Sequence, residues 1–434
     1  MGKSNLEAHY SGEAEQEFKA RSLTPRPTQP LLEILHPYTY MASLLNKLSD
    51  WSERADDVLT RARARLGLLH PLQVVSYRSY GTPDRLYVKG RLLTDKGIGE
   101  PDPSDSRWHN LLNMYRRFDS NEISGAVLDV RPADGSAHPV VTDEEGYFTL
   151  NLEPKVLPEP IDYLWYPVDV AVQQVPAPFP LPAQLATQAM VLIPPADAEY
   201  GIISDLDDTV IQTSATDLLR MARTVLLRNA RSRLPFKGVA EFYRQLQLGR
   251  NGKRNNPFFY VSSSPWNLYD LLEDFLNLND IPPGPLLLRD MALGGKKAGD
   301  ASAHHGHKLK EIDNLLLTYP KLPFVLIGDS GQEDANIYRE VVRRHPGRIL
   351  AIYIRDVNLP ERSAMVARVS EELRSDKVEM LLVKDTVQAA EHAAGAGLVF
   401  QEAVSAVEAE KQKDEQPDDN GELDGKGSGQ PVMK

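Results

Sequence analysis

Three carboxylates stand within four residues at the end of an apolar run, in Gly201-Ile-Ile-Ser-Asp205-Leu-Asp207-Asp208-Thr209. Grouping these anions is costly unless a cation neutralises them. A hard divalent ion with oxygen ligands, most simply Mg²⁺, meets that need. An acidic strand end, or a helix N-cap made by Asp208 or Thr209, is the alternative interpretation.

A hydroxyl cluster follows a second apolar run, Phe258–Val261, and reads Ser262-Ser263-Ser264-Pro265. Hydroxyls and backbone amides that open a helix suit a phosphate oxygen. Ordinary N-capping explains the same residues if they stand alone.

A lysine and a second acidic pair complete the set. Lys308 is predicted at the beginning of an amphipathic helix, where its charge offsets the charge that develops in a phosphoryl transfer. Lys296, Lys297 and Lys310 compete with it for this role. Further on, a buried strand ends in Gly-Asp329, and Asp334 follows five positions later. Asp329 is expected to bind the metal, and Asp334 to join it directly or through a water molecule.

These four groups together predict phosphoryl transfer. In this interpretation Asp205 attacks phosphorus and forms an aspartyl-phosphate, and Mg²⁺ holds the phosphoryl oxygens. Asp207 protonates the departing alcohol and then activates the hydrolytic water. The expected catalytic residues are Asp205, Asp207, Ser262 and Lys308, the expected metal ligands are Asp205, Asp207, Asp329 and Asp334, and Thr209, Ser263 and Arg355 are expected to contact substrate.

The amino-acid sequences of these motifs are similar to those of one family. The segments SDLDDTVIQTSAT, FFYVSSSPWNLYDLL, GHKL, PFVLIGDSGQEDANIY and AIYIRDV, with VSYRSYGTP upstream, resemble the actin-patch-protein type of phosphatidate phosphatase and its bacterial relatives. That family lies within the haloacid-dehalogenase-like phosphohydrolases. The resemblance spans roughly residues 70 to 395. It implies Mg²⁺-dependent cleavage of phosphatidate to diacylglycerol and phosphate.

Two other functions remain open, because the motifs surround the phosphate and not the group that leaves. One is hydrolysis of a water-soluble phosphomonoester by the same mechanism. The other is a non-catalytic membrane-binding or protein-binding module with a vestigial site.

The elements that position these residues form an α/β domain over residues 196–400. Apolar strands alternate there with helical stretches, in GIISD, FFYVS, PLLLRD, FVLIGD, ILAIYIRD and VEMLLV. This alternation predicts a Rossmann-like, mostly parallel sheet covered on both faces, with ligands beyond the carboxyl ends of the strands.

A smaller β domain is predicted before it, over residues 70–195. The short strands LYVKGRLL, ISGAVLDV, GYFTLNL, DYLWYPVDVAV and AMVLIPP are typical of an antiparallel β-sandwich, here of the prealbumin-like kind. The clearest hairpin signal runs from Thr142 to Phe148 with Gly146 in the turn. No catalytic set is evident, so binding or scaffolding is expected, with a protein partner left unidentified.

Four segments are predicted to lie outside these cores. Residues 1–36 form a flexible arm, 37–69 an amphipathic helical segment, and 405–434 a disordered acidic tail. The segment 37–69 either packs on the protein or lies on an anionic membrane. The insert 216–231 mixes leucines with arginines and is either a lid that meets lipid or a flap helix packed on the core.

Composition narrows the function classes. The net charge of −12 over 434 residues speaks against nucleic-acid binding. The chain has no cysteine, which excludes disulfides and thiolate sites. No signal peptide and no run of roughly 18 apolar residues is evident, so we expect a cytoplasmic protein with peripheral contact to an anionic inner leaflet.

Overall fold

The computed structural model describes residues 69–94, 122–157, 159–206, 237–289 and 301–415. The predicted arm 1–36, residues 37–68 of the amphipathic segment and the insert 216–231 lie outside these ranges. Asp207, Asp208 and Thr209 also lie outside them.

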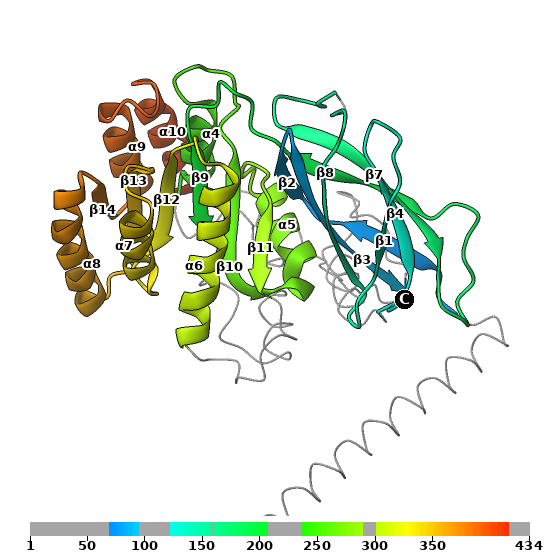
Figure 1. Ribbon diagram of the computed structural model, residues 1–434. Coiled ribbons are helices and arrows are strands. Elements are labelled where there is room, and N and C mark those ends of the chain that lie inside the picture. The colour runs from blue at the N-terminus through cyan, green and yellow to red at the C-terminus, as the bar shows by residue number, and fades with distance from the viewer. Residues whose placement is uncertain (1–68, 95–121, 158, 207–236, 290–300, 416–434) are drawn as a thin grey trace, which may run out of the picture. The chain divides into compact units, whose positions relative to one another are not determined.

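Six strands of the C-terminal region form one parallel sheet (Figure 1). All neighbouring strands pair in parallel, which confirms the predicted α/β class. In sheet order the strands are β11 (Leu286–Arg289), β10 (Phe258–Pro265), β9 (Gly201–Asp205), β12 (Phe324–Asp329), β13 (Ile349–Arg355) and β14 (Glu379–Val383).

Helices cover both faces of this sheet, and successive residues of a strand face opposite layers. Ile202 of β9 lies in one apolar cluster and Ile203 lies in the other. The first cluster includes residues of α4 (Val239–Leu248), α5 (Tyr269–Leu278), α9 (Thr386–Gly395) and α10 (Ala403–Glu415). The second includes residues of α6 (Ala301–Thr318), α7 (Asp334–Arg344) and α8 (Pro360–Leu373).

The strand order reverses in the middle of the sheet. From β9 the chain first adds β10 and β11 on one side, and it then crosses to add β12, β13 and β14 on the other. In open parallel sheets such a reversal leaves a crevice beyond the carboxyl ends of the two central strands, where ligands bind. Asp205 ends β9 and Asp329 ends β12, so both acids lie at the position where this crevice is expected.

The N-terminal region forms one connected sheet of eight strands, mostly antiparallel, with one parallel pair between β2 and β8. The predicted class is therefore confirmed, although the strands join in a single hydrogen-bonded sheet and not in two separate ones. The strands are β1 (Leu72–Ser76), β2 (Ser79–Thr82), β3 (Arg85–Thr94), β4 (Val127–Arg131), β5 (His138–Val141), β6 (Tyr147–Leu152), β7 (Trp165–Gln174) and β8 (Ala186–Leu192).

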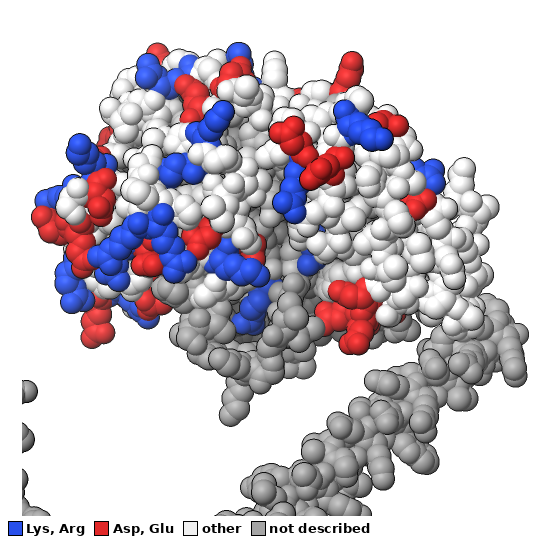
Figure 2. All heavy atoms as spheres, viewed as in Figure 1, with Lys and Arg blue, Asp and Glu red and all other residues white. Residues whose placement is uncertain are grey.

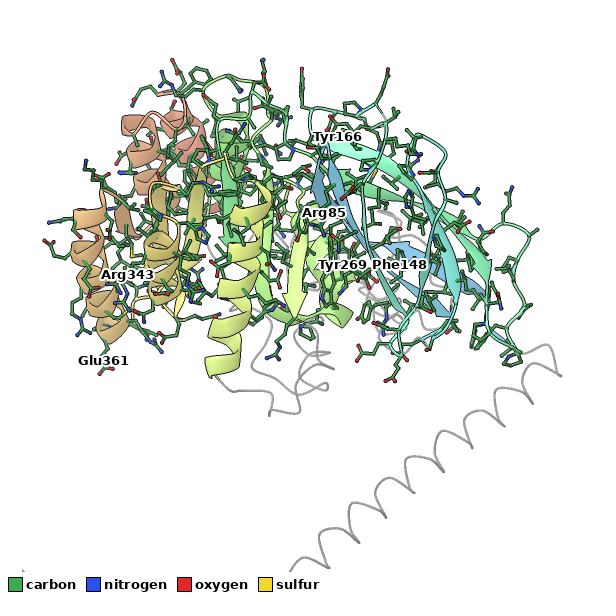
Figure 3. The ribbon with its side chains drawn as sticks, viewed as in Figure 1. Arg85, Phe148, Tyr166, Tyr269, Arg343 and Glu361 are labelled. Carbon is green, nitrogen blue, oxygen red and sulfur yellow. The ribbon has the colours of Figure 1, made fainter. Side chains whose placement is uncertain are left out.

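The predicted turn before Tyr147 forms, but the predicted hairpin is wrong. Gly146 has φ +76°, and the Asp143 side chain accepts a hydrogen bond from the Tyr147 amide at 2.9 Å. However, β5 pairs with β4, whereas β6 pairs with β3. Gly90 of β3 explains the choice of β6, because a Cβ at Gly90 would lie 2.4 Å from the Phe148 ring, which Figure 3 labels.

Aromatic side chains join the two sheets within the unit Leu68–Lys434. The Tyr77 ring lies 5.2 Å from the Trp266 ring and 4.1 Å from that of Tyr269, which is labelled in Figure 3. The Tyr269 hydroxyl accepts a hydrogen bond from the Arg78 amide at 2.7 Å. Since Trp266 lies just after the serine cluster, the N-terminal sheet helps to fix the end of β10.

The predicted disordered tail begins too early. Residues 405–415 belong to α10, whose Val407 is fully buried. Lys411 Nζ lies 2.8 Å from Asp385 Oδ2, and the Asp414 side chain accepts a hydrogen bond from the Gly238 amide at 2.8 Å. The segment is polar in sequence because α10 is held by few apolar side chains, by one ion pair with Asp385 and by one hydrogen bond from Gly238.

Candidate active site

A buried lysine joins two carboxylates at the crevice. Lys308 Nζ lies 2.8 Å from Asp205 Oδ1 and 3.1 Å from Asp334 Oδ1, and it donates to Gln332 Oε1 at 3.1 Å. The side chain is 4% exposed. An ammonium this deep in the protein is stable only when it is paired and hydrogen-bonded.

The helix that carries Lys308 begins earlier than expected. It starts at Ala301, so Lys308 lies in its third turn and not at its beginning. Lys310 on the same helix is exposed, and the other two competing lysines lie outside the described residues. The structure therefore brings Lys308 to the predicted nucleophile, and Lys310 points to solvent.

Asp334, at the start of α7, uses both carboxylate oxygens on protein donors. Oδ1 faces Lys308, and Oδ2 accepts a hydrogen bond from the Asp329 amide at 3.1 Å. A Cβ at Gly328 would lie 2.5 Å from Asp334 Oδ2, so the glycine before Asp329 makes room for this carboxylate. Asp334 thereby orients the lysine and the end of β12.

Asp329 is the second carboxylate of the crevice and is nearly buried. Its Oδ1 accepts hydrogen bonds from the amides of Gly331 at 2.8 Å and Gln332 at 3.3 Å. Its Oδ2 lies 4.0 Å from Arg355 Nη2. Arg355 ends the neighbouring strand β13, which places this predicted substrate contact beside Asp329.

The serine cluster lies on the other side of Asp205. Val261 pairs with Asp205 across the sheet, so Ser262 and Ser263 follow directly at the edge of the crevice. Ser262 Oγ accepts a hydrogen bond from the Ser264 amide at 3.0 Å. The expectation that these serines open a helix is wrong, because β10 continues to Pro265 and a 3-10 turn at Trp266–Leu268 precedes α5.

Two tyrosines that were not predicted as site residues, Tyr243 and Tyr338, contact the strands that carry Asp205 and Asp329. The Tyr243 and Ser204 hydroxyls lie 2.7 Å apart, and burial raises the pKa of Tyr243 to about 12. Tyr338 donates to the Ile327 carbonyl at 2.7 Å. Burial, and then the nearby charge of Asp334, hold the pKa of Tyr338 well above its usual value. Tyr243 lies outside the motifs quoted above, so no signal in one sequence marks it. Tyr338 and Gln332 lie inside the motif PFVLIGDSGQEDANIY, but only the folded structure shows that they contact β12 and Lys308, respectively.

The described carboxylates suit Mg²⁺ in chemistry but do not complete a site. Asp205 and Asp329 present carboxylate oxygens at the ends of adjacent strands, and oxygen is the donor type that a hard cation prefers. Within the residues that the structure describes, no three acidic or histidine side chains converge to hold a metal ion. Asp207, the third predicted ligand, lies outside those residues.

Residues 200–356 match the family model described as the phosphatidate phosphatase APP1 catalytic domain. These residues are similar to that family. The matched range contains every site residue that the sequence analysis predicted. The match ends at residue 356, one residue after Arg355.

Two curated proteins are similar over the APP1 catalytic region. The phosphatidate phosphatase APP1 of Saccharomyces cerevisiae is 36% identical over 156 residues, which cover 36% of this chain and 25% of that protein. An uncharacterized protein of Schizosaccharomyces pombe is 30% identical over 158 residues, with the same two shares. The chain thus spans about a quarter of the length of the curated relatives that it matches.

Two solved structures align with the chain at low similarity. A β-glucuronidase of Parabacteroides merdae aligns with a TM-score of 0.21 and 11% identity, covering 71% of this chain and 38% of that one. A β-glucuronidase of Bifidobacterium dentium gives 0.24 and 9%, covering 80% and 58%. Scores this low carry no argument. Separately, the described part of the chain contains no helix with the length and hydropathy needed to cross a bilayer.

Proposed function

We propose that this chain is a phosphatidate phosphatase that hydrolyses phosphatidate to diacylglycerol and phosphate. The observation that carries the proposal is the buried contact of 2.8 Å between Lys308 and Asp205 at the strand-order reversal. A carboxylate held beside a fixed cation is suited to attack a phosphate ester, because the cation offsets the charge that accumulates. The APP1 match over the same residues supports the choice of phosphatidate.

The proposed reaction has two steps. An Asp205 oxygen attacks phosphorus, so that an aspartyl-phosphate forms while the bond between phosphorus and the lipid oxygen breaks. Asp207 gives its proton to that oxygen, which leaves as the hydroxyl of diacylglycerol. Asp207 then takes a proton from water as the water attacks phosphorus, and inorganic phosphate leaves with Asp205 restored.

The other residues position the phosphoryl group. Lys308 fixes Asp205 and adds positive charge at the reacting centre. Ser262, Ser263 and Thr209 are proposed to donate hydrogen bonds to the phosphoryl oxygens, and Arg355 to contact the substrate from β13. Asp334, originally expected as a metal ligand, is proposed to act by orienting Lys308.

Mg²⁺ is the proposed cofactor, held by Asp205, Asp207 and Asp329. When bound, it would neutralise phosphoryl charge and lower the repulsion between the anions. The oxygen-only character of the described donors supports this metal over softer ones.

Phosphate release with Mg²⁺ tests the proposal. The substrates are phosphatidate in mixed micelles and a panel of sugar and nucleotide phosphates. We expect wild type to have its highest kcat/KM on phosphatidate, and Asp205→Asn to remain folded by circular dichroism without measurable release. Asp376→Asn is a matched control, because Asp376 is exposed and lies before the start of β14, at the amino-terminal ends of the strands and away from Asp205.

Two results would reject the proposal in different ways. A folded Asp205→Asn protein with undiminished turnover would remove Asp205 as the nucleophile. A higher kcat/KM on a member of the soluble panel would keep the mechanism but replace the lipid by a water-soluble phosphomonoester.

A further inference from the structure

A second polar cavity opens at the carboxyl edge of the six-stranded sheet, beside the candidate active site. Its volume is ≈ 500 Å³, and its walls come from the ends of β13 and β14, the segment before α4 and the last turns of α10. Four lining residues are basic, namely Lys237, Arg355, Lys384 and Lys411. Three are acidic, namely Asp356, Asp385 and Glu415.

Two of the three acids are engaged by protein donors. Asp385 Oδ1 accepts a hydrogen bond from the Gln388 amide at 3.0 Å, and its Oδ2 lies 2.8 Å from Lys411 Nζ. Asp356 Oδ1 accepts a hydrogen bond from the Ser363 hydroxyl at 2.9 Å. The Asp385 and Lys411 charges thus offset each other, which leaves the three cations Lys237, Arg355 and Lys384 against the two anions Asp356 and Glu415, so that positive charge is in excess.

Lys237 and Lys384 differ in their ion pairing from the arginines on α7 and α8. On α7 and α8, arginines such as Arg343 pair with acids such as Glu372, and Figure 2 shows the two signs side by side on that face. In the part of the chain that the structure describes, the ammonium groups of Lys237 and Lys384 make no ion pair. Both side chains are exposed, and both line the cavity.

The cavity is too far from the nucleophile to hold the phosphoryl group under attack. Neighbouring strands lie about 4.8 Å apart, so β13 is about 10 Å and β14 about 14 Å from β9, which carries Asp205. Arg355 lies between the two places, since it lines the cavity and its Nη2 is 4.0 Å from Asp329 Oδ2. An anionic ligand in the cavity would therefore be a different group from the phosphoryl group that Asp205 attacks, although the two would lie close together.

We propose that the cavity formed by Lys237, Lys384 and Arg355 binds a second phosphoryl group, the headgroup phosphate of another phosphatidate molecule beside the substrate. This inference rests on the proposed function. Lysine ammonium groups bind phosphate as point charges, and cations next to an anionic bilayer each strengthen attachment. The cavity thus holds the enzyme on a phosphatidate-containing surface while the neighbouring lipid reacts.

Vesicle binding and soluble turnover test this cavity separately from the reaction. Wild type, Lys384→Gln and the double variant Lys237→Gln/Lys384→Gln are floated with phosphatidylcholine vesicles that contain one-fifth phosphatidate. We expect binding about fivefold weaker for the single variant and about 25-fold weaker for the double variant. Phosphate release from a soluble short-chain phosphomonoester should stay within about twofold of wild type for both, because neither lysine touches the reacting atoms. Lys321→Gln is the matched control, since Lys321 is exposed before β12 at the opposite edge of the sheet.

Each outcome decides the inference. Unchanged vesicle binding by the double variant, or an equal loss with Lys321→Gln, would overturn it. If calorimetry shows that the double variant loses binding of inorganic phosphate but keeps vesicle binding, the cavity takes free phosphate and the lipid assignment is wrong. If the variants lose vesicle binding but wild type does not hydrolyse phosphatidate, the cavity stands and the proposed function fails.

Discussion

Replacing Lys308 by methionine separates its structural contribution from its catalytic one. The change keeps the length of the side chain and removes a charge that lies 2.8 Å from Asp205 and 3.1 Å from Asp334. At an effective dielectric constant of about 20, the gross attractions are about 6 and 5 kcal/mol. The cost of desolvating the three charged groups offsets most of this attraction. The free energy of unfolding of Lys308→Met is therefore expected to be about 3–5 kcal/mol lower than that of wild type.

The loss of stability arises because two buried carboxylates lose their cation. A second change, Asp334→Asn, removes one of those charges, so Lys308→Met/Asp334→Asn should recover part of the lost stability. It should not recover activity, because the fixed charge beside Asp205 is still missing. For the single and the double variant alike, kcat is expected to fall by about 10²–10³.

Urea unfolding followed by circular dichroism gives the free energies, and phosphate release with saturating Mg²⁺ gives kcat. The reasoning is refuted if the double variant is less stable than Lys308→Met, since unpaired charge would then not be the cause. It is also refuted if either variant keeps kcat within about twofold of wild type while folded.

Three further changes probe the surroundings of the site. Asp329→Asn should raise the Mg²⁺ concentration for half-maximal phosphate release by at least about tenfold; an unchanged Mg²⁺ titration would show that Asp329 binds no metal. Gly328→Ala would press a Cβ onto the Asp334 carboxylate, 2.5 Å away, and should lower kcat by about 10²-fold; full activity would mean that this carboxylate does not orient the lysine. Because burial raises the pKa of Tyr243 to about 12, its neutral phenol stabilises the fold fully below pH 10 and loses that contribution as the pH rises towards 12. The unfolding free energy of Tyr243→Phe should therefore fall less steeply than that of wild type between pH 10 and 12, and parallel curves would contradict this.

The sequence was sufficient to predict the strands of the C-terminal sheet and the convergence of their ends. Each strand is a buried apolar run, and Asp205, Ser262 and Asp329 directly follow or end such runs. Because parallel strands carry their carboxyl ends to one edge, these residues had to lie near one another. Lys308 was selected by motif and spacing, and the structure brings its ammonium to Asp205.

Other features were beyond a single sequence because they depend on tertiary contacts. Asp334 has the spacing of a metal ligand, but only the fold shows that its oxygens face Lys308 and the Asp329 amide. The short strands β1, β2 and β5 have four or five residues each, too few for a clear alternating pattern. The helix α10 was hidden because Val407 is one of few apolar anchors in a charged segment.

β14 is the edge strand of the parallel sheet next to β13, and a stable fragment of the catalytic region must include it. β14 pairs with β13 from Ala351 to Arg355, and it follows residue 356, where the APP1 match stops. A chain cut there would lack β14, the outer neighbour of β13. The unpaired backbone N–H and C=O groups of β13 could then pair with a strand of a second fragment. Recombinant fragments trimmed to the matched borders should consequently aggregate, whereas those extended through Glu415 keep β14 paired with β13.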